Sequence, residues 1–316
     1  MSRSVDELVN IEGIGRVTVA RLKSAGINYL EDLVVYNPEE LEELAGIESE
    51  KAAKVIRAAR RLLGWEARVV RGREYAEQLA RRDTFTTGVK DIDELLGGGI
   101  AVYDIYEFAG EFGSGKTQLC HQLSVTVQLP PARGGLGGGA VYIDTEGTFS
   151  PERVEAIARR FGVEDPLSGI FVGRPINVDE MEELVVRKLP ELMREGVRLV
   201  IVDSIIALYR AEFKGREWLA ARQQRINYLL DWLKRTARVH SAAVVVTNQV
   251  VAVPSSWGVT LKLPAGGNII AHASTHRFFM RKAGDVWAVE CLDSPRIPRG
   301  AAASFLIADD GLRDVK

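Results

Sequence analysis

One stretch, Gly110–Thr117, limits what this 316-residue chain can fold into more than any other feature. Its letters, GEFGSGKT, fit the phosphate-loop pattern of glycine, four residues, glycine, lysine and a hydroxyl residue. The glycines let backbone amides point at phosphate oxygens, Lys116 reaches the terminal phosphates, and Thr117 Oγ ligates magnesium. A strand-like run, Val102–Ala109, precedes the loop and a helical pattern, Thr117–Gln128, follows it. This context favours a true nucleotide site, so we expect ATP and Mg²⁺ as cofactors.

Downstream of this loop, apolar strand-like runs alternate with helical patterns. The runs are Ala140–Asp144, Gly169–Val172, Val197–Asp203 and Ala242–Asn248, and the helical patterns are Pro151–Phe161, Asp179–Arg194 and Trp218–Val239. Such alternation is typical of a mostly parallel sheet covered on both faces. A hairpin is predicted from Thr275–Arg281 and Val286–Leu292. The predicted fold class is therefore α/β, with a P-loop ATPase core.

Three polar residues emerge where predicted strands end, the edge at which ligands bind in open α/β sheets. Asp203 ends an apolar strand and, with a phosphate loop present, is predicted to organise magnesium. Ser204 follows it, where many mechanical ATPases carry their catalytic glutamate, so the water-activating base must lie elsewhere. Glu146 supplies such a base, with an ordinary surface glutamate as the alternative. The Gln249 amide can sense the γ-phosphate, although a surface amide explains it equally well.

Composition excludes several other classes of protein. A hydrophobic fraction of 46% and a charged fraction of 27% exclude wholesale disorder. No apolar run approaches the ~18 residues of a membrane span, and residues 1–10 are too polar for a secretory signal. Two isolated cysteines and four scattered histidines exclude a disulfide framework and argue against structural zinc. We therefore expect a cytoplasmic protein with no membrane partner, whose net charge of −2 leaves nucleic-acid binding to local patches.

Charge is divided unevenly along the chain. Residues 1–50 carry 4 basic and 11 acidic side chains, whereas residues 51–82 carry 10 basic and 3 acidic. This break predicts an N-terminal domain over residues 1–63, a basic linker over residues 64–82 and an ATPase core over residues 83–316.

The N-terminal part contains short helical stretches separated by glycine turns. Gly13-Ile14-Gly15 is one such turn, and a similar arrangement recurs at Gly46-Ile47. Glycines between short helices permit a tight hairpin that exposes amides at the next helix start. The arrangement resembles a helix-hairpin-helix pair, in which Gly13, Gly15 and Arg16 would contact duplex DNA. A helical protein-interaction domain is the alternative, and the acidic balance of residues 1–50 leaves both open.

A first basic segment follows the predicted magnesium strand. Residues 210–225 carry a net charge of +3, with Phe213 and Trp218 interleaved. Arginines beside small and aromatic residues suit phosphate contact and base stacking on single-stranded nucleic acid. A solvated helix face would explain residues 218–225 without DNA.

A second segment, residues 250–282, contains no acidic residue. Within it, Val253–Gly258 and Pro264–Gly267 have loop composition. A long acid-free loop after Gln249 is harder to explain as a solvated surface, because long loops are uncommon unless they are functional or disordered.

Together these residues resemble the RecA-type recombinases, in particular the archaeal RadA branch and its eukaryotic relatives. The resemblance covers nearly the whole chain and rests on Gly110–Gln118, Tyr142–Phe149, Leu199–Ser204, Leu208–Gln223, Thr247–Val250, Gly266–Ser274 and Asp293–Pro295. It implies a RecA-type core with a helix-hairpin-helix N-terminal domain, and ATP-dependent filaments on single-stranded DNA that find homologous duplex and exchange strands. The implied partners are single-stranded DNA, double-stranded DNA and further copies of the chain, in a helical filament or ring, with room for accessory recombination proteins.

The resemblance also implies a role for individual residues. ATP binding is implied for Gly110, Glu111, Phe112, Gly113, Ser114, Gly115, Lys116, Thr117, Gln118 and Arg153, the last of which stacks on adenine. Catalysis is implied for Glu146, Lys116 and Gln249, and magnesium binding for Thr117 and Asp203. DNA binding is implied for Arg210, Phe213, Arg216 and Arg222 in a first loop, and for Val251, Gly266, Gly267 and Asn268 in a second. A cap over ATP bound to the neighbouring subunit is implied for Asp293, Ser294, Pro295 and Pro298, so ATP would lie at a subunit interface.

The chain departs from the family pattern in its linker. The family carries a Phe-x-x-Ala polymerisation motif whose Phe inserts into the adjacent protomer, and here Val69 and Gly72 occupy those two positions. At about 25 cal/mol per Å² of apolar surface, Val in place of Phe weakens each junction by about 1–2 kcal/mol. Ser150 replaces a usual Arg, and Pro175 interrupts a segment that is usually Ala-Phe-Asn-like.

Two alternative functions stay open. Weakened linker docking favours a recombinase paralogue that acts as a mediator and does not exchange strands. A hexameric helicase or clock-type ATPase on the same core is the second alternative, and the stretches Leu208–Gln223 and Gly266–Ser274 count against it.

Overall fold

The computed structural model describes residues 2–67, 69–254 and 260–315. The chain divides into two compact units, Met1–Arg81 and Arg82–Lys316, which we describe one at a time.

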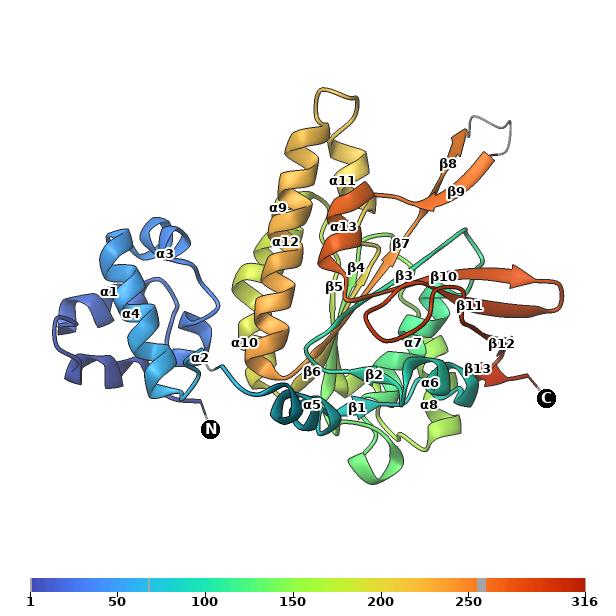
Figure 1. The fold of residues 1–316 in the computed structure, drawn as a ribbon, viewed down its shortest axis with the longest axis horizontal. Coiled ribbons are helices and arrows are strands. Elements are labelled where there is room, and N and C mark those ends of the chain that lie inside the picture. The colour runs from blue at the N-terminus through green and yellow to red at the C-terminus, as the bar shows by residue number, and fades with distance from the viewer. Residues whose placement is uncertain (1, 68, 255–259, 316) are drawn as a thin grey trace. The chain divides into compact units, whose positions relative to one another are not determined.

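The larger unit is built on a nine-stranded sheet among its described residues, in the order β13-β12-β11-β10-β3-β7-β6-β4-β5 (Figure 1). Its strands are β3 (Ile105–Gly110), β4 (Gly139–Asp144), β5 (Ile170–Gly173), β6 (Val197–Asp203), β7 (Ala243–Asn248), β10 (His276–Ala283), β11 (Val286–Asp293), β12 (Ala302–Ala308) and β13 (Gly311–Asp314). Neighbouring strands from β10 to β5 are parallel, whereas β10, β11, β12 and β13 pair antiparallel. The sheet is therefore mostly parallel, as the sequence predicts.

Helices cover both faces of this sheet (Figure 1). One face carries α6 (Lys90–Leu96), α7 (Lys116–Thr126) and α8 (Pro151–Phe161), and the other carries α9 (Val178–Glu183), α10 (Leu189–Arg194), α12 (Leu219–His240) and α13 (Gly267–Ala273). A π-helical turn, Leu184–Lys188, joins α9 to α10, and α11 (Ala207–Glu212) follows β6. Short 3-10 turns occur at Pro131–Arg133 and Leu167–Gly169. The helix α8 begins where predicted, because the Ser150 hydroxyl accepts from the Arg153 amide at 3.2 Å and Pro151 occupies the first helical position.

The central strands are buried along their whole length. Every residue of β3 and of β7 is buried, as expected for parallel strands with helices on both faces. Glu107 of β3 is the charged exception: it is 0% exposed and accepts hydrogen bonds from Asn248 Nδ2 at 2.7 Å and Arg277 Nε at 2.6 Å. A buried carboxylate needs such partners, so this pair fixes β3 between β7 and β10.

The C-terminal hairpin is larger than the sequence predicts. The predicted hairpin is present as β10 and β11, and the two strands β12 and β13 extend it antiparallel. A separate pair, β1 (Thr84–Phe85) and β2 (Ile100–Ala101), was also not predicted.

The segment predicted as a long loop after Gln249 contains a ribbon instead. Strands β8 (Val250–Pro254) and β9 (Thr260–Pro264) pair antiparallel and project from the main sheet (Figure 1). The loop prediction for Val253–Gly258 is thus wrong at its first two residues, and residues 255–259 lie outside the described part. Ala265 and Gly266 form the turn that leads into α13.

The smaller unit is all-helical in its described residues apart from one isolated bridge between Ser4 and Tyr29. Its elements are a 3-10 helix (Val5–Asn10), α1 (Arg16–Ser24), α2 (Leu30–Leu33), α3 (Pro38–Ala45), α4 (Ser49–Leu62) and α5 (Gly72–Ala80). A capping box starts α3, in which Asn37 and Glu40 each bond the backbone of the other. None of the residues of α5 is buried. In the parts of the chain described here, no helix is long and apolar enough to cross a bilayer.

Candidate nucleotide and DNA site

The phosphate loop connects β3 to α7, and its backbone path depends on glycine. Gly113 and Gly115 have φ angles of +78° and +94°, in the region that residues with a Cβ rarely adopt. A Cβ at Gly110 would lie 2.3 Å from the carbonyl oxygen of Met280 on β10. These three positions therefore admit only glycine.

Lys116 turns back over the loop from the first position of α7. Its Nζ donates to the carbonyl oxygens of Gly110 and Glu111, at 2.9 and 2.8 Å, and to a loop hydroxyl at 3.2 Å. Burial lowers the pKa of Lys116, while the nearby charges of Asp203 and Glu146 oppose that shift. The ammonium is thus held by three oxygen atoms that phosphate oxygens can replace.

Asp203, at the carboxyl end of β6, is 3% exposed and surrounded by hydroxyl groups. Its Oδ2 accepts from Thr117 Oγ1 and from Tyr142 OH, each at 2.8 Å, and its Oδ1 accepts from Thr247 Oγ1. Three donors replace the water that burial removes from this carboxylate. A hydroxyl and a carboxylate oxygen are ligand types that Mg²⁺ uses beside nucleotide phosphates, so Thr117 and Asp203 fit this ion.

A chain of hydrogen bonds starts at Glu146, which follows β4. Glu146 Oε1 accepts from Ser204 Oγ at 2.6 Å and from Gln249 Nε2 at 2.9 Å. Gln249 Oε1 in turn accepts from Arg210 Nη1 at 2.9 Å. The predicted base, the predicted γ-phosphate sensor and the first arginine of the basic segment therefore form one connected group.

Other contacts bind the phosphate loop to neighbouring strands. Glu111 forms an ion pair with Lys262 of β9 at 2.8 Å, and the Gly113 carbonyl accepts from Trp287 Nε1 at 3.0 Å. Phe112, at the tip of the loop, is fully exposed. The ribbon of the second basic segment is thus joined to the nucleotide motif directly.

Arg153 lies beside this loop in the first turn of α8. Its guanidinium donates to Gln118 Oε1 and to the carbonyl oxygens of Ala308 and Asp309. These bonds connect α7 and α8 to the turn between β12 and β13. The adenine contact implied for Arg153 stays a prediction.

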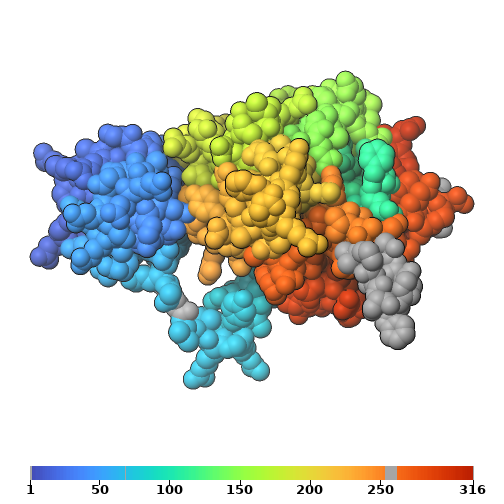
Figure 2. Space-filling view, turned by 90° about the horizontal axis from the view of Figure 1, so that it is seen from above, coloured from blue at the N-terminus to red at the C-terminus, as the bar shows by residue number. Residues whose placement is uncertain are grey.

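A hollow of about 330 Å³ is lined by residues of both basic segments. It contains Arg210 and Arg222 from the first segment, and Val251, Gly266 and Gly267 from the second. Seen from above in Figure 2, the yellow surface of the first segment adjoins the orange surface of the second. Arg222 Nε has no hydrogen-bond partner among the described residues, although it is buried. The two arginines that line the hollow favour an anionic ligand such as a phosphate backbone.

The other residues predicted to contact DNA lie outside this hollow. The Phe213 ring packs 6.4 Å from the Tyr209 ring and 6.2 Å from the Trp218 ring. Phe213 is therefore part of an aromatic cluster within the protomer. Arg216 and Asn268 are exposed, the latter at the start of α13.

The predicted cap residues begin with Asp293, the last residue of β11, and continue between β11 and β12. Ile297 is buried in the core and anchors this segment, whereas Asp293, Pro295 and Pro298 are exposed. Asp293 pairs with Arg277, at the amino end of β10. The phosphate loop instead follows the carboxyl end of the parallel strand β3, which ends three residues beyond Glu107, the partner of Arg277, or about 10 Å further along the sheet at ~3.3 Å per residue.

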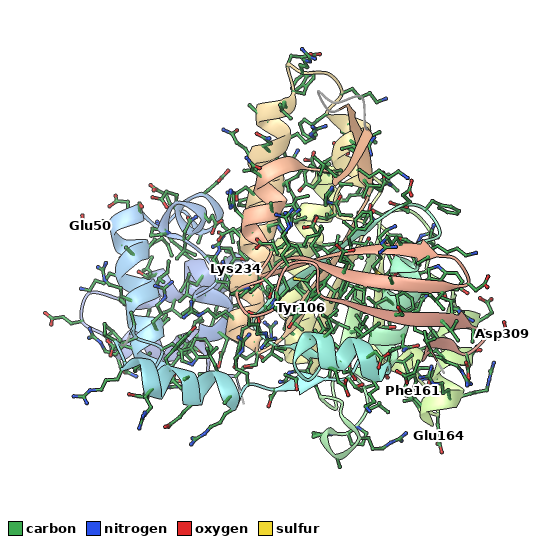
Figure 3. All side chains as sticks on the ribbon, turned by 45° about the vertical axis from the view of Figure 1, so that its right-hand side comes forward. Glu50, Tyr106, Phe161, Glu164, Lys234 and Asp309 are labelled. Atoms are coloured by element: carbon green, nitrogen blue, oxygen red, sulfur yellow. The ribbon has the colours of Figure 1, made fainter. Side chains whose placement is uncertain are left out.

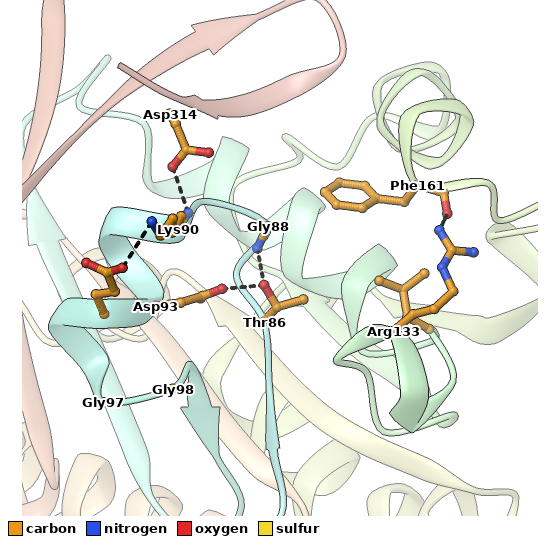
Figure 4. Close-up of a pocket in the computed structure, with 11 residues that line it drawn as sticks. Thr86, Gly88, Lys90, Asp93, Gly97, Gly98, Arg133, Phe161 and Asp314 are labelled. Carbon is orange, nitrogen blue, oxygen red and sulfur yellow. Dashed lines mark hydrogen bonds and ion pairs between the residues drawn. The ribbon is translucent and has the colours of Figure 1, made fainter. Parts of the chain in front are cut away.

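A larger hollow, of about 620 Å³, lies elsewhere in this unit (Figure 4). It is lined by residues such as Thr86, Gly88, Arg133 and Phe161, and by Lys90, whose backbone amide donates to Asp314 at 2.7 Å. Its volume alone gives it no role, because the phosphate loop, the magnesium ligands and both basic segments are absent from its lining.

In the smaller unit, the predicted duplex-binding turn precedes α1. Gly13 has a φ of +80°, and the Lys54 ammonium packs against it, 2.4 Å from where a Cβ would lie. Gly15 caps the amino end of α1, and Arg16 follows as an exposed residue. Contact with duplex DNA stays a prediction.

The predicted polymerisation positions lie in the linker. Val69 is fully exposed at 104%, and Gly72 begins α5.

Comparison with known proteins identifies the family. The sequence model of the Rad51 family matches residues 81–315. The chain belongs to the Rad51 family. A model described as a SAM-like helix-hairpin-helix tandem matches residues 5–61. The chain is also similar to the DNA repair and recombination protein RadA of Cenarchaeum symbiosum (strain A), with 39% identity over 318 residues, covering 98% of this chain and 79% of that protein.

These matches confirm the predicted resemblance and the predicted combination of a RecA-type α/β core with a helix-hairpin-helix domain. The family is one of DNA repair and recombination proteins.

Sequence reasoning missed several residues of this Rad51-family site. Tyr142 and Thr247 donate hydrogen bonds to Asp203. In the sequence, nothing distinguishes them from other residues of an apolar strand. The signal for Thr247 is register: Val202 pairs with Val246, so the next residue of each strand lies side by side. Lys262 belongs to the acid-free segment of residues 250–282, and its sequence position gives no sign of its ion pair with Glu111.

Proposed function

We propose that this Rad51-family protein is an ATP-dependent recombinase that assembles on single-stranded DNA, pairs it with homologous duplex and exchanges strands. The observation that carries the proposal is the continuous connection from Arg210 through Gln249 to Glu146. Arg210 lines the basic hollow, and the charge of Glu146 acts on Lys116 of the phosphate loop motif. A single amide therefore separates the surface that would hold DNA from the carboxylate that would activate water.

ATP supplies the phosphoryl group, and Mg²⁺ neutralises its charge when bound. Lys116 and the loop amides bind phosphate oxygens, while Thr117 and Asp203 hold the ion. Glu146 orients or deprotonates the attacking water, and because its Oε1 is occupied in the hydrogen-bonded chain, the proton goes to Oε2.

The basic hollow supplies the DNA contacts of the proposal. Arg210 and Arg222 bind phosphates of the single strand, and the glycine-bearing turn at Gly266 and Gly267 lets the backbone approach closely. When the γ-phosphate is present, its contact with Gln249 favours the arrangement that binds DNA, and its loss shifts the population away from it. Duplex DNA would be captured by the helix-hairpin-helix domain.

The nucleotide site is tested with Lys116→Ala. This substitution removes the cation that neutralises terminal phosphates, so binding of single-stranded DNA should lose its dependence on ATP. Fluorescence anisotropy of a labelled oligonucleotide measures this, and ATP-dependent binding by the variant would contradict the proposed site.

The base assignment is tested with Glu146→Gln. The amide keeps the shape of the side chain but takes up no proton, so hydrolysis should slow by about 10²–10⁴-fold while ATP is still bound. Turnover at the wild-type rate would show that the base is a different group.

A recombinase mediator is the second candidate, and the exposed Val69 in the linker favours it. Electron microscopy with ATP and single-stranded DNA separates the two. Long helical filaments support the recombinase, whereas monomers or small rings support the mediator.

A further inference from the structure

A buried polar cluster lies at the end of the sheet away from the phosphate loop. Asp104 precedes β3 and His276 begins the parallel strand β10. Asp104 Oδ2 bonds Arg82 Nη2 at 2.9 Å and His276 Nε2 at 3.3 Å. The three side chains are 12%, 16% and 1% exposed for Asp104, Arg82 and His276, so water contributes little to satisfying them.

The cluster continues into the cap segment through Ser294. His276 Nδ1 lies 2.8 Å from Ser294 Oγ, and this oxygen also accepts from the backbone amides of Arg296 at 3.3 Å and Ile297 at 3.1 Å. A hydroxyl has two acceptor sites and one donor proton. Because both acceptor sites are used by the amides, the Ser294 proton is donated to His276 Nδ1.

This arrangement fixes the tautomer of the imidazole. With Nδ1 accepting, the ring proton is on Nε2 and is donated to Asp104. Burial alone would raise the pKa of Asp104, but hydrogen bonds from His276 and Arg82 outweigh it and lower that pKa. The carboxylate therefore stays charged and keeps His276 turned toward Ser294.

Tyr106 supports the same group from the side. Its ring, labelled in the interior of the unit in Figure 3, stacks on His276 with centroids 4.7 Å apart. Its hydroxyl accepts from Arg296 Nη2 at 3.3 Å. Tyr106 and His276 thus each bond a side chain of the cap segment, Arg296 and Ser294 respectively.

The strand β11 runs away from the phosphate loop of its own protomer, so the cap segment leaves the sheet toward the opposite end. We propose that His276 is a positioning residue that fixes the cap segment through Ser294, and so orders it over ATP bound to a neighbouring copy of the chain. The proposal rests on the proposed function and on the position of ATP at a subunit interface that the family resemblance implies. The series of contacts runs from Arg82, the first residue of the larger unit, through Asp104 and His276 to Ser294. One carboxylate, that of Asp104, therefore links the end of the linker to the cap segment.

Two substitutions of His276 separate this role from simple stability. In His276→Asn, the side-chain oxygen takes the place of Nδ1 and still accepts from Ser294, while the contact with Asp104 is lost. In His276→Gln, the amide nitrogen takes the place of Nε2 and still donates to Asp104, while the contact with Ser294 is lost. Each variant leaves one buried group without its partner, so the two should melt at similarly lowered temperatures.

The measurement is the ATPase activity of the full chain with single-stranded DNA, with KM for ATP and kcat determined separately. His276→Gln should raise KM about five- to tenfold at nearly unchanged kcat, because a loose cap weakens ATP binding at the interface. His276→Asn should keep KM within about twofold of wild type. Ser294→Ala removes the same contact from the cap side and should match His276→Gln, and the double variant should be no worse than either single one.

Equal KM values for the two His276 variants, raised or unraised, overturn the inference, as does additivity in the double variant. These results leave the proposed function intact, because wild-type turnover is unaffected. A wild-type protein with no DNA-dependent turnover overturns both the proposed function and the inference.

Discussion

Replacing Val69 by Phe tests whether the linker limits assembly. The Val69 side chain is 104% exposed, so none of its apolar surface is used within the protomer and all of it is available to a neighbouring copy. Fully burying an apolar side chain contributes about 1.5–3 kcal/mol, with Val near the lower end and Phe near the upper end. Val69→Phe should therefore strengthen each junction by about 1–2 kcal/mol. At 1.4 kcal/mol per factor of ten, this is roughly a 5- to 30-fold tighter junction.

The assay is assembly on a labelled single-stranded oligonucleotide with ATP and magnesium, followed by fluorescence anisotropy. The protein concentration at the midpoint should fall by roughly the same 5- to 30-fold for Val69→Phe. Val315→Phe is the matched control, since Val315 is also exposed but lies outside the linker.

An unchanged midpoint for Val69→Phe would refute the reasoning, because added apolar area at a buried junction must strengthen it. An equal shift in Val315→Phe would show that the ring acts through non-specific association. A shift confined to the linker variant would explain how a chain with Val69 in this position assembles weakly.

Two further predictions concern the folded core. Tyr142→Phe removes the 2.8 Å bond to Asp203 without opening a cavity, so urea denaturation should show about 1.5–3 kcal/mol lower free energy of unfolding, and an unchanged value would contradict the role of that hydroxyl. Burial, reinforced by Arg153 for one ring and by Arg194 for the other, lowers the pKa of His121 and His240 to about 4. The unfolded chain then binds more protons between about pH 6.5 and pH 4, so the melting temperature should fall as the pH drops through that window and stay level above it; a flat profile would show that these rings are hydrated.

The parts of the fold that the sequence predicted well are those specified by neighbouring residues. The helix α8 has its predicted bounds because Ser150 and Pro151 mark its start locally. The strand β6 also has its predicted bounds, because an unbroken apolar run ends at Asp203. The phosphate loop is recognisable for the same reason.

The parts of the fold that were not predicted depend on how strands pair in space, which neighbouring residues in the sequence do not specify. Among the described residues, the ribbon of β8 and β9 pairs only with itself, and Pro254 and Pro264, which end its two strands, are typical of loop composition. The strands β12 and β13 extend a hairpin, and β13 has only four residues, two of them buried. At the site, the hydroxyls of Tyr142 and Thr247 reach Asp203 only through the register of a parallel sheet, which a single sequence does not give.

The DNA contacts show the same division. Basic composition predicted the two segments, and the hollow that joins Arg210 to Gly266 brings them together. Composition did not indicate that the Phe213 ring would pack against the rings of Tyr209 and Trp218. An aromatic side chain in a basic segment can pack against neighbours within its own protomer as well as against a ligand.

The two hydrogen bonds that Glu146 Oε1 accepts have a consequence for how much ATP the protein hydrolyses when it is not bound to DNA. While Ser204 and Gln249 both bond that oxygen, half of the carboxylate is unavailable to water. Under the proposed function, a protomer away from DNA would hydrolyse its triphosphate slowly, because only Oε2 of Glu146 is free to take up the proton. Movement of Arg210 toward a phosphate backbone would release Gln249 from Oε1 of Glu146. Hydrolysis would then speed up, so the lifetime of each assembled copy would depend on when it binds DNA.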